Sequence, residues 1–277
     1  MQRGRLAIAL LLGLLAGLAA AQRRVEVPVD KVALTASWFA VPGSQPRPAV
    51  LALHGCNGAL DSKGGLNELQ RRYAALFNRQ QVHVLVLDSF TARGRREICS
   101  LPSSQRPITL SMRRDDVGAA LAWLAARPEV DATRLVLLGW SHGAQTVLAA
   151  LDASDPAVRE RAVQPRAAVA FYPGCTGPQR NFNYRLQVPL LMLLGEKDDW
   201  TPVAPCQALH QRLAPQAPAF ELEVYADSYH AFDSMSAVRV RDNVGSTRSG
   251  TATVGANPAA REASRERMLR FLAEQLR

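Results

Sequence analysis

The stretch LVLLGWSHGAQTVLAAL, residues 135–151, places a serine between two glycines at the end of an apolar run. The residues before Gly139 are typical of a buried strand, and those after Ser141 are typical of a helix. A serine at such a strand-to-helix turn is typical of a nucleophile, because bulky side chains near the backbone prevent the turn from closing. The pattern G-x-S-x-G occurs by chance in about one chain in ten of this length. An ordinary loop is therefore the alternative, and the context decides between them.

Apolar runs and amphipathic segments alternate along the rest of the chain. The expected strands are residues 32–41, 49–55, 82–88, 134–139, 167–174, 189–195 and 220–226, and the expected helices are residues 66–80, 112–127, 142–153, 203–214 and 259–276. Near-continuous apolar strands separated by helices predict an α/β fold, a mostly parallel twisted sheet with helices on both faces. The first two strands, joined by a turn around Gly43, predict an antiparallel hairpin at the N-terminal edge.

The first 21 residues have the pattern of a secretory signal peptide. MQRGR supplies positive charge, residues 6–18 are apolar, and three alanines at 19–21 precede Gln22. A membrane anchor is the alternative, but the apolar run is shorter than the roughly 20 residues that span a bilayer. We expect cleavage after Ala21, a periplasmic or secreted protein without stable membrane insertion, and one catalytic domain over residues 22–277.

The chain is basic, with 33 lysines and arginines against 24 acidic residues and a net charge of +9. Apart from RGRR at residues 93–96, the positive residues are scattered, and no nucleic-acid-binding motif accompanies them. We therefore interpret the charge as a solvated surface or a preference for acidic surroundings, and expect no nucleic-acid partner.

Two polar segments after later strands complete a possible catalytic set. LLGEKDDWTP, residues 193–202, places three acids after a strand, and YADSYHAF, residues 225–232, places His230 after the last expected strand. Reactive groups gather at the carboxyl ends of parallel strands. Serine, acid and histidine in this chain order, starting with Ser141, predict an α/β-hydrolase.

Each residue type has a distinct task in this chemistry. The hydroxyl of Ser141 is a weak nucleophile, so a neutral imidazole, here His230, has to take its proton as it attacks. A buried carboxylate fixes the tautomer of that imidazole, and we assign this role to Asp198. Asp199 is its rival, and Glu196 is a weaker one.

The tetrahedral oxyanion needs backbone N–H donors. We expect these from His142, which follows the nucleophile, and from Cys56 in LALHGCNG, residues 51–58. Trp140 either lines the acyl pocket or packs beneath it.

Other polar residues have structural interpretations. His83 lies in a strand and His210 on a helix, where a histidine is usually structural. We expect His54 to brace the oxyanion loop by hydrogen bonds. Asp227 is close enough in sequence to His230 to cap its turn instead of orienting it.

Six motifs occur in order along the chain: LALHGCNG, VLDSFTARG, PEVDATRLVLLGWSHGA, AFYPGC, LLGEKDDWTP and YHAFD. With them the chain resembles the dienelactone hydrolase family of α/β-hydrolases over nearly all of its expected mature length. The resemblance implies the sheet described above and a catalytic triad, whose acid in the pattern G-x-x-D-x-x-x-P matches Asp198. The founding enzymes of the family use a cysteine nucleophile, whereas this chain has Ser141. Hydrolysis of an ester or similar acyl bond is implied, and dienelactone as the substrate is not.

Four cysteines in an exported protein favour disulfides, and three connectivities are possible. The expected sheet brings Cys56 and the loop of Cys99 to the same end of neighbouring strands, and it brings Cys175 close to Cys206. We predict these two bridges. The alternative is that Cys56 is a free thiol beside the site.

Two long loops leave the reactive edge, residues 91–107 and 233–258. The second is either a mobile lid or disordered surface. We expect Arg93 to be a substrate-pocket residue, together with Trp140. Five arginines are candidates to attract an acidic substrate: Arg93, Arg95, Arg96, Arg239 and Arg241.

The sequence thus predicts a serine hydrolase that cleaves small carboxylic esters through an acyl-enzyme, with no cofactor and no metal. A peptidase or amidase of the same fold is one alternative. A catalytically silent binding protein is the other, and the complete set of reactive residues argues against it.

Overall fold

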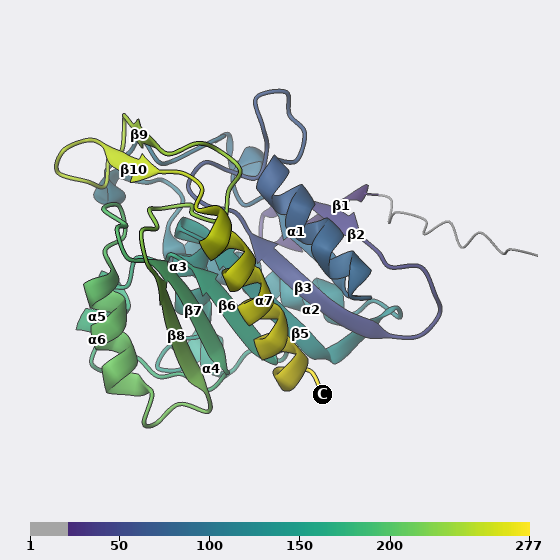
Figure 1. Ribbon diagram of the computed structural model, residues 1–277. Coiled ribbons are helices and arrows are strands. Elements are labelled where there is room, and N and C mark those ends of the chain that lie inside the picture. The colour runs from purple at the N-terminus through teal and green to yellow at the C-terminus, as the bar shows by residue number, and fades with distance from the viewer. Residues whose placement is uncertain (1–21) are drawn as a thin grey trace, which may run out of the picture.

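The computed structural model describes residues 22–277, so the predicted signal peptide lies outside the described residues (Figure 1). One sheet has the strand order β1-β2-β4-β3-β5-β6-β7-β8. β2 pairs antiparallel with both β1 and β4. All other neighbours in the sheet, from β4 with β3 to β7 with β8, pair in parallel. Their bounds are β1 Gln22–Val29, β2 Val32–Phe39, β3 Arg47–Leu53, β4 His83–Leu87, β5 Val130–Trp140, β6 Ala167–Phe171, β7 Leu190–Gly195 and β8 Phe220–Tyr225.

Helices cover both faces of the sheet, as the alternating pattern predicts (Figure 1). One face packs against α2 (Leu110–Ala125), α3 (His142–Ala150) and α6 (Val203–Leu213). The other face packs against α1 (Glu68–Arg79) and α7 (Pro258–Gln275). The short helical segments are η1 Thr91–Arg93, η2 Ser103–Gln105, α4 Pro156–Arg159 and α5 Thr176–Arg180.

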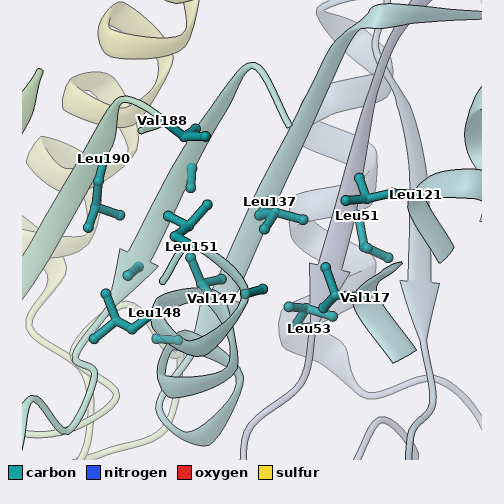
Figure 2. Packing of buried hydrophobic residues seen from close by; sticks show 14 of the residues in the cluster. Leu51, Leu53, Val117, Leu121, Leu137, Val147, Leu148, Leu151, Val188 and Leu190 are labelled. Carbon is teal, nitrogen blue, oxygen red and sulfur yellow. The ribbon is translucent and has the colours of Figure 1, made fainter. Parts of the chain in front are cut away.

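The central strands are apolar on both faces because both faces are covered. Alternate residues of β5 belong to different cores, since Leu137 packs with α2 and α3 while Val136 packs on the side of α1 and α7. Figure 2 shows the first core, where Leu51 and Leu53 of β3 lie beside side chains of α2. This double burial fixes the sheet rigidly, so the loops at its carboxyl edge start from defined positions.

The N-terminal hairpin is confirmed, but its strands differ from those expected. β2 pairs with β1 through a tight turn at Asp30, whose φ is 45°. β4 lies between β2 and β3, so the segments on either side of Gly43 are not neighbours. The alternation of valines at 25, 27 and 29 is the period-two signal of this extra strand.

The 233–258 segment folds over the carboxyl edge of the sheet. It forms a two-stranded antiparallel ladder between β9 (Arg239–Arg241) and β10 (Ala252–Val254), which Figure 1 shows at the end of the sheet where α7 begins. The N–H of Gly255 donates to the carbonyl of His230 at 3.0 Å, and the N–H of Gly245 donates to the carbonyl of Cys99 at 3.0 Å. The segment is thus joined to both sides of the expected site. Within residues 22–277, no helix combines the length and apolar character needed to cross a bilayer.

Candidate active site

Ser141 lies at the turn between β5 and α3, with φ 53° and ψ −117°. This backbone conformation is strained for a residue with a side chain. The two flanking positions have no room for a side chain. A Cβ at Gly139 would lie 2.4 Å from the carbonyl oxygen of Gly143. A Cβ at Gly143 would lie 2.0 Å from the carbonyl oxygen of Leu53. The two glycines therefore let α3 start directly against the ends of β5 and β3.

Three residues from separate loops meet at this turn. The Oγ of Ser141 lies 2.9 Å from the Nε2 of His230, and the Nδ1 of His230 lies 2.8 Å from the Oδ2 of Asp198. His230 is 3% exposed and Asp198 is 5% exposed, so the ring and its carboxylate are shielded from water. Hydroxyl, imidazole and carboxylate form one continuous chain of hydrogen-bond contacts.

The carboxylate of Asp198 is held by its own loop. Its Oδ1 accepts the N–H groups of Trp200 and Thr201 at 2.9 and 2.8 Å. The hydroxyl of Thr201 lies 2.9 Å from Oδ2 and 3.1 Å from the Nδ1 of His230. Sequence reasoning missed Thr201, although its place three residues after Asp198 is the spacing of a local side-chain turn.

The rival acids contact other groups. Asp199 accepts the N–H and the hydroxyl of Thr253, each at 2.8 Å, and so holds β10. The carboxylate of Glu196 accepts the N–H of Asp227 at 3.1 Å. Asp227 itself forms an ion pair with Lys197. Of these acids, Asp198 is the one in contact with His230.

His54 braces the loop that follows β3. The Nδ1–H of His54 donates to the carbonyl of Gly55 at 2.7 Å, and its Nε2 accepts the N–H of Ser89 at 3.2 Å. Burial lowers the pKa of His54 to about 3, so the ring is neutral, as this bonding pattern requires. A Cβ at Gly55 would lie 3.6 Å from the Cβ of Ser141, which places Cys56 and its loop beside Ser141.

Both predicted disulfides are present, Cys56 with Cys99 and Cys175 with Cys206. Their Cα atoms are 4.9 and 5.0 Å apart. The alternative of a free thiol at Cys56 is therefore wrong. The first bridge ties the loop after β3 to the 91–107 loop, and the carbonyl of Cys56 accepts the N–H of Ile98 at 2.8 Å.

Two cavities open on either side of Ser141. One, of about 200 Å³, lies under the 233–258 segment and is lined by Trp140, Trp200, His230, Arg239 and Arg241, among others. The other, of about 380 Å³, is lined by His142, Arg106 and Gln145, among others. No aspartate or glutamate of the described chain lines either cavity, so the fixed full charges at their walls belong to arginines.

The two residues expected at the substrate pocket have different places. Trp140 lines the first cavity, and its indole Nε1 also donates to Asp233 at 3.0 Å. Arg93 lines neither cavity, because its guanidinium is held by both carboxylate oxygens of Asp116 at 2.7 and 2.8 Å. The pocket role expected for Arg93 therefore has no support in its contacts.

Two further histidines have structural contacts, as expected. The Nδ1 of His83 accepts the N–H of Val41 at 2.9 Å, and its Nε2 lies 2.9 Å from the carbonyl of Glu129. The Nε2 of His210 lies 2.9 Å from the carbonyl of Phe220.

Comparison with known families agrees with this arrangement. Residues 75–276 match the model of the Dienelactone hydrolase family. The chain belongs to the dienelactone hydrolase family. It is therefore a hydrolase, and membership of this family supports the serine hydrolase type. A search of curated proteins found no match.

Solved structures of similar fold include proteins named as dienelactone hydrolases, dienelactone hydrolase-like enzymes or esterases. A dienelactone hydrolase-like promiscuous phosphotriesterase from metagenomic libraries superposes with a TM-score of 0.72 at 19% identity, over 94% of this chain and 100% of that one. A putative dienelactone hydrolase from Klebsiella pneumoniae gives 0.65 at 19% identity, over 92% and 99% of the two chains. Esterase 2 from Thermogutta terrifontis gives 0.67 at 16% identity, over 91% and 94%. At these identities the likeness concerns the fold.

Proposed function

We propose that this hydrolase cleaves small carboxylic esters through an acyl-enzyme on Ser141. The observation that carries the proposal is the contact of its Oγ with the Nε2 of His230 at 2.9 Å, continued to Asp198 at 2.8 Å. A hydroxyl next to a neutral imidazole loses its proton as it attacks a carbonyl carbon, and the carboxylate stabilises the imidazolium that results.

In the proposed reaction, the imidazolium of His230 gives its proton to the departing alcohol. Water then attacks the acyl-enzyme with His230 again as the base, which releases the acid and restores Ser141. The N–H groups of Cys56 and His142 are the proposed donors to the tetrahedral oxyanion. Support comes from their places, since His142 begins α3 and the first N–H groups of a helix have no intrahelical acceptor. The mechanism requires no cofactor or metal.

The proposed mature enzyme begins at Gln22 as one catalytic domain and acts in the periplasm or outside the cell. The two disulfides support this location, because such bridges persist in oxidising compartments. The two cavities beside Ser141 are the proposed sites of the acyl and alcohol groups.

Incubation with p-nitrophenyl acetate and with a fluorophosphonate probe tests the proposal. We expect ester turnover and labelling by the wild type, both lost in Ser141→Ala and both retained in Ser62→Ala, whose serine is exposed and lines neither cavity. Labelling accompanied only by amide turnover would indicate an amidase. A protein with neither activity would be a silent binding protein.

A further inference from the structure

Arg113 of α2 is an arginine buried without an acidic partner. Its side chain is 0% exposed. Within residues 22–277 it forms no ion pair, because the nearby Asp116 is occupied by both guanidinium nitrogens of Arg93. Buried arginines are normally paired, since an uncompensated charge in the interior is costly. The place of Arg113 therefore calls for a reason other than the stability of the core.

The guanidinium of Arg113 contacts two segments at the active site. Its Nη1 lies 2.7 Å from the Nδ1 of His142, and its Nη2 donates to the carbonyl of His54 at 2.9 Å. His142 directly follows Ser141, and His54 lies two residues before Cys56. One rigid planar group thus joins the two segments that hold the proposed oxyanion donors.

These two segments are in close contact, so their relative position matters. A Cβ at Gly143 would lie 2.6 Å from the carbonyl oxygen of His54, the same oxygen that Arg113 holds. A Cβ at Gly55 would lie 3.4 Å from the carbonyl oxygen of Trp140. The turn at Ser141 and the loop after β3 are therefore packed backbone against backbone, without space for a side chain at Gly143. A change in the bridging group is therefore expected to move one proposed donor relative to the other.

The charge of Arg113 also lies near the place where negative charge develops. Burial lowers the pKa of Arg113 to about 9, against the opposing effect of Asp116 and Asp88, so the guanidinium stays protonated at neutral pH. The ring of His142 is neutral, because burial and this cation hold its pKa well below the usual value. The Nδ1 of His142 therefore accepts a hydrogen bond from the Nη1–H of Arg113, which keeps its proton. A fixed cation in a dry site stabilises a developing oxyanion more than one in water does.

We propose that Arg113 is a positioning residue of the oxyanion hole, which fixes the backbone of His142 relative to that of Cys56 and favours the tetrahedral intermediate by its charge. This inference rests on the proposed function. It assigns to α2 a positioning role, through two hydrogen bonds and without contact with the substrate.

The test compares Arg113→Met and Arg113→Lys with Arg114→Met, the same change at the next residue of α2. Arg114 pairs with Asp115 and Asp155, away from the proposed hole. The measurements are kcat and KM for p-nitrophenyl acetate and the inhibition constant of a methyl trifluoromethyl ketone, which becomes a hemiketal oxyanion on Ser141. Melting temperatures identify the variants that fold.

We expect Arg113→Met to lower kcat about 100-fold with little change in KM, and to raise the inhibition constant of the ketone by a similar factor. Arg113→Lys keeps the charge but cannot reach both acceptors, so we expect a loss of about 10-fold in each quantity. Arg114→Met should stay within about twofold of the wild type in kcat, since surface substitutions rarely act at a distance.

Several outcomes would overturn the inference. A folded Arg113→Met with the kcat of the control would do so, as would a loss of kcat without weaker ketone inhibition. If Arg113→Met does not fold, Arg113→Lys is the deciding variant. Wild-type kcat and ketone inhibition in Arg113→Lys would then reject the positioning role. If neither variant folds, Arg113 serves the core alone. Failure of the proposed function is distinct, because the wild type would then show no turnover and no ketone inhibition.

Discussion

Two buried charges lie near Ser141 on opposite faces of the sheet, and they are held in different ways. Asp233 lies on the face of α1 and α7, where its carboxylate accepts hydrogen bonds at 2.8, 3.0 and 2.7 Å from Tyr73, Trp140 and Tyr172. Arg113 lies on the face of α2 and is held by one ring nitrogen and one carbonyl, while its Nε has no partner within the described chain.

The difference suggests that the two charges have different tasks. The partners of Asp233 are buried aromatic side chains of the core, although Trp140 and Tyr172 also line the first cavity. Burial still raises the pKa of its carboxyl despite the three donors. The partners of Arg113 are the first residue of α3 and the loop after β3, both at the reactive edge. Loss of Asp233 should therefore appear mainly in stability, whereas loss of Arg113 should appear mainly in turnover.

The largest expected effect concerns a carboxylate that contacts the imidazole directly. We expect Asp198→Ala to lower kcat about 10⁴-fold, because His230 loses the group that fixes its tautomer and stabilises the imidazolium. Asp199→Ala is the matched control and should change kcat by less than about threefold, since this side chain holds Thr253 instead. Steady-state kinetics on p-nitrophenyl acetate provide the measurement. A larger loss in the control would reassign the acid.

Asp233→Ala tests the stability side of the comparison. Three buried donors lose their acceptor, and at about 1–3 kcal/mol for each unsatisfied group we expect the free energy of unfolding to fall by at least about 3 kcal/mol. Urea denaturation measures it. The control is Asp242→Ala, an exposed acid whose loss should cost less than about 0.5 kcal/mol. Unchanged stability together with a large loss of kcat would place Asp233 in the catalytic machinery and end the contrast.

Acid lability is expected from the rings on the oxyanion side. Burial lowers the pKa of His54 to about 3 and that of His142 well below 6.5. Below pH 6.5 the unfolded state therefore binds more protons at these two rings than the folded state does. Stability therefore rises with pH in this range, and it is lost as pH falls below 6.5. The loss is about 1.4 kcal/mol per pH unit for the ring of His54, and the ring of His142 acts in the same direction. Urea denaturation at pH 6.5 and 4.5 measures the loss, and ring signals of both histidines in NMR should stay in their neutral positions. Protonation of either ring in the folded protein above pH 5 would contradict the prediction.

The strand-to-helix turn at Ser141, the disulfides and the fold could be predicted because each has a local or topological signal in the sequence. Glycines on both sides of Ser141 report the tight turn, and strand-helix alternation reports the parallel sheet. The place of β4 between β2 and β3 has no such signal, because sequence periodicity identifies strands and not their neighbours.

Arg113 was missed because a single charged residue on a helix is normally interpreted as a surface residue. In α2, Arg113 is buried and Arg114 is not, although both stand in the same charged run. One signal was available. The apolar face of Val117, Ala120, Leu121 and Leu124 extends back by one helical turn to Arg113, which places it on the core side.

The smallest expected effect concerns the rim of the first cavity, where Arg239 and Arg241 face the site and Glu97 partly offsets their charge. Since exposed charge pairs contribute about 0.2–1 kcal/mol, Arg239→Glu/Arg241→Glu should raise KM for the p-nitrophenyl monoester of succinate about fivefold over its effect on the acetate. Arg23 and Arg79 are exposed and line neither cavity, so Arg23→Glu/Arg79→Glu makes the same change in net charge outside the two cavities. If both double variants raise KM equally for the anionic ester, the attraction comes from the overall field of the protein. If the rim variant affects both esters equally, these arginines do not select for charge.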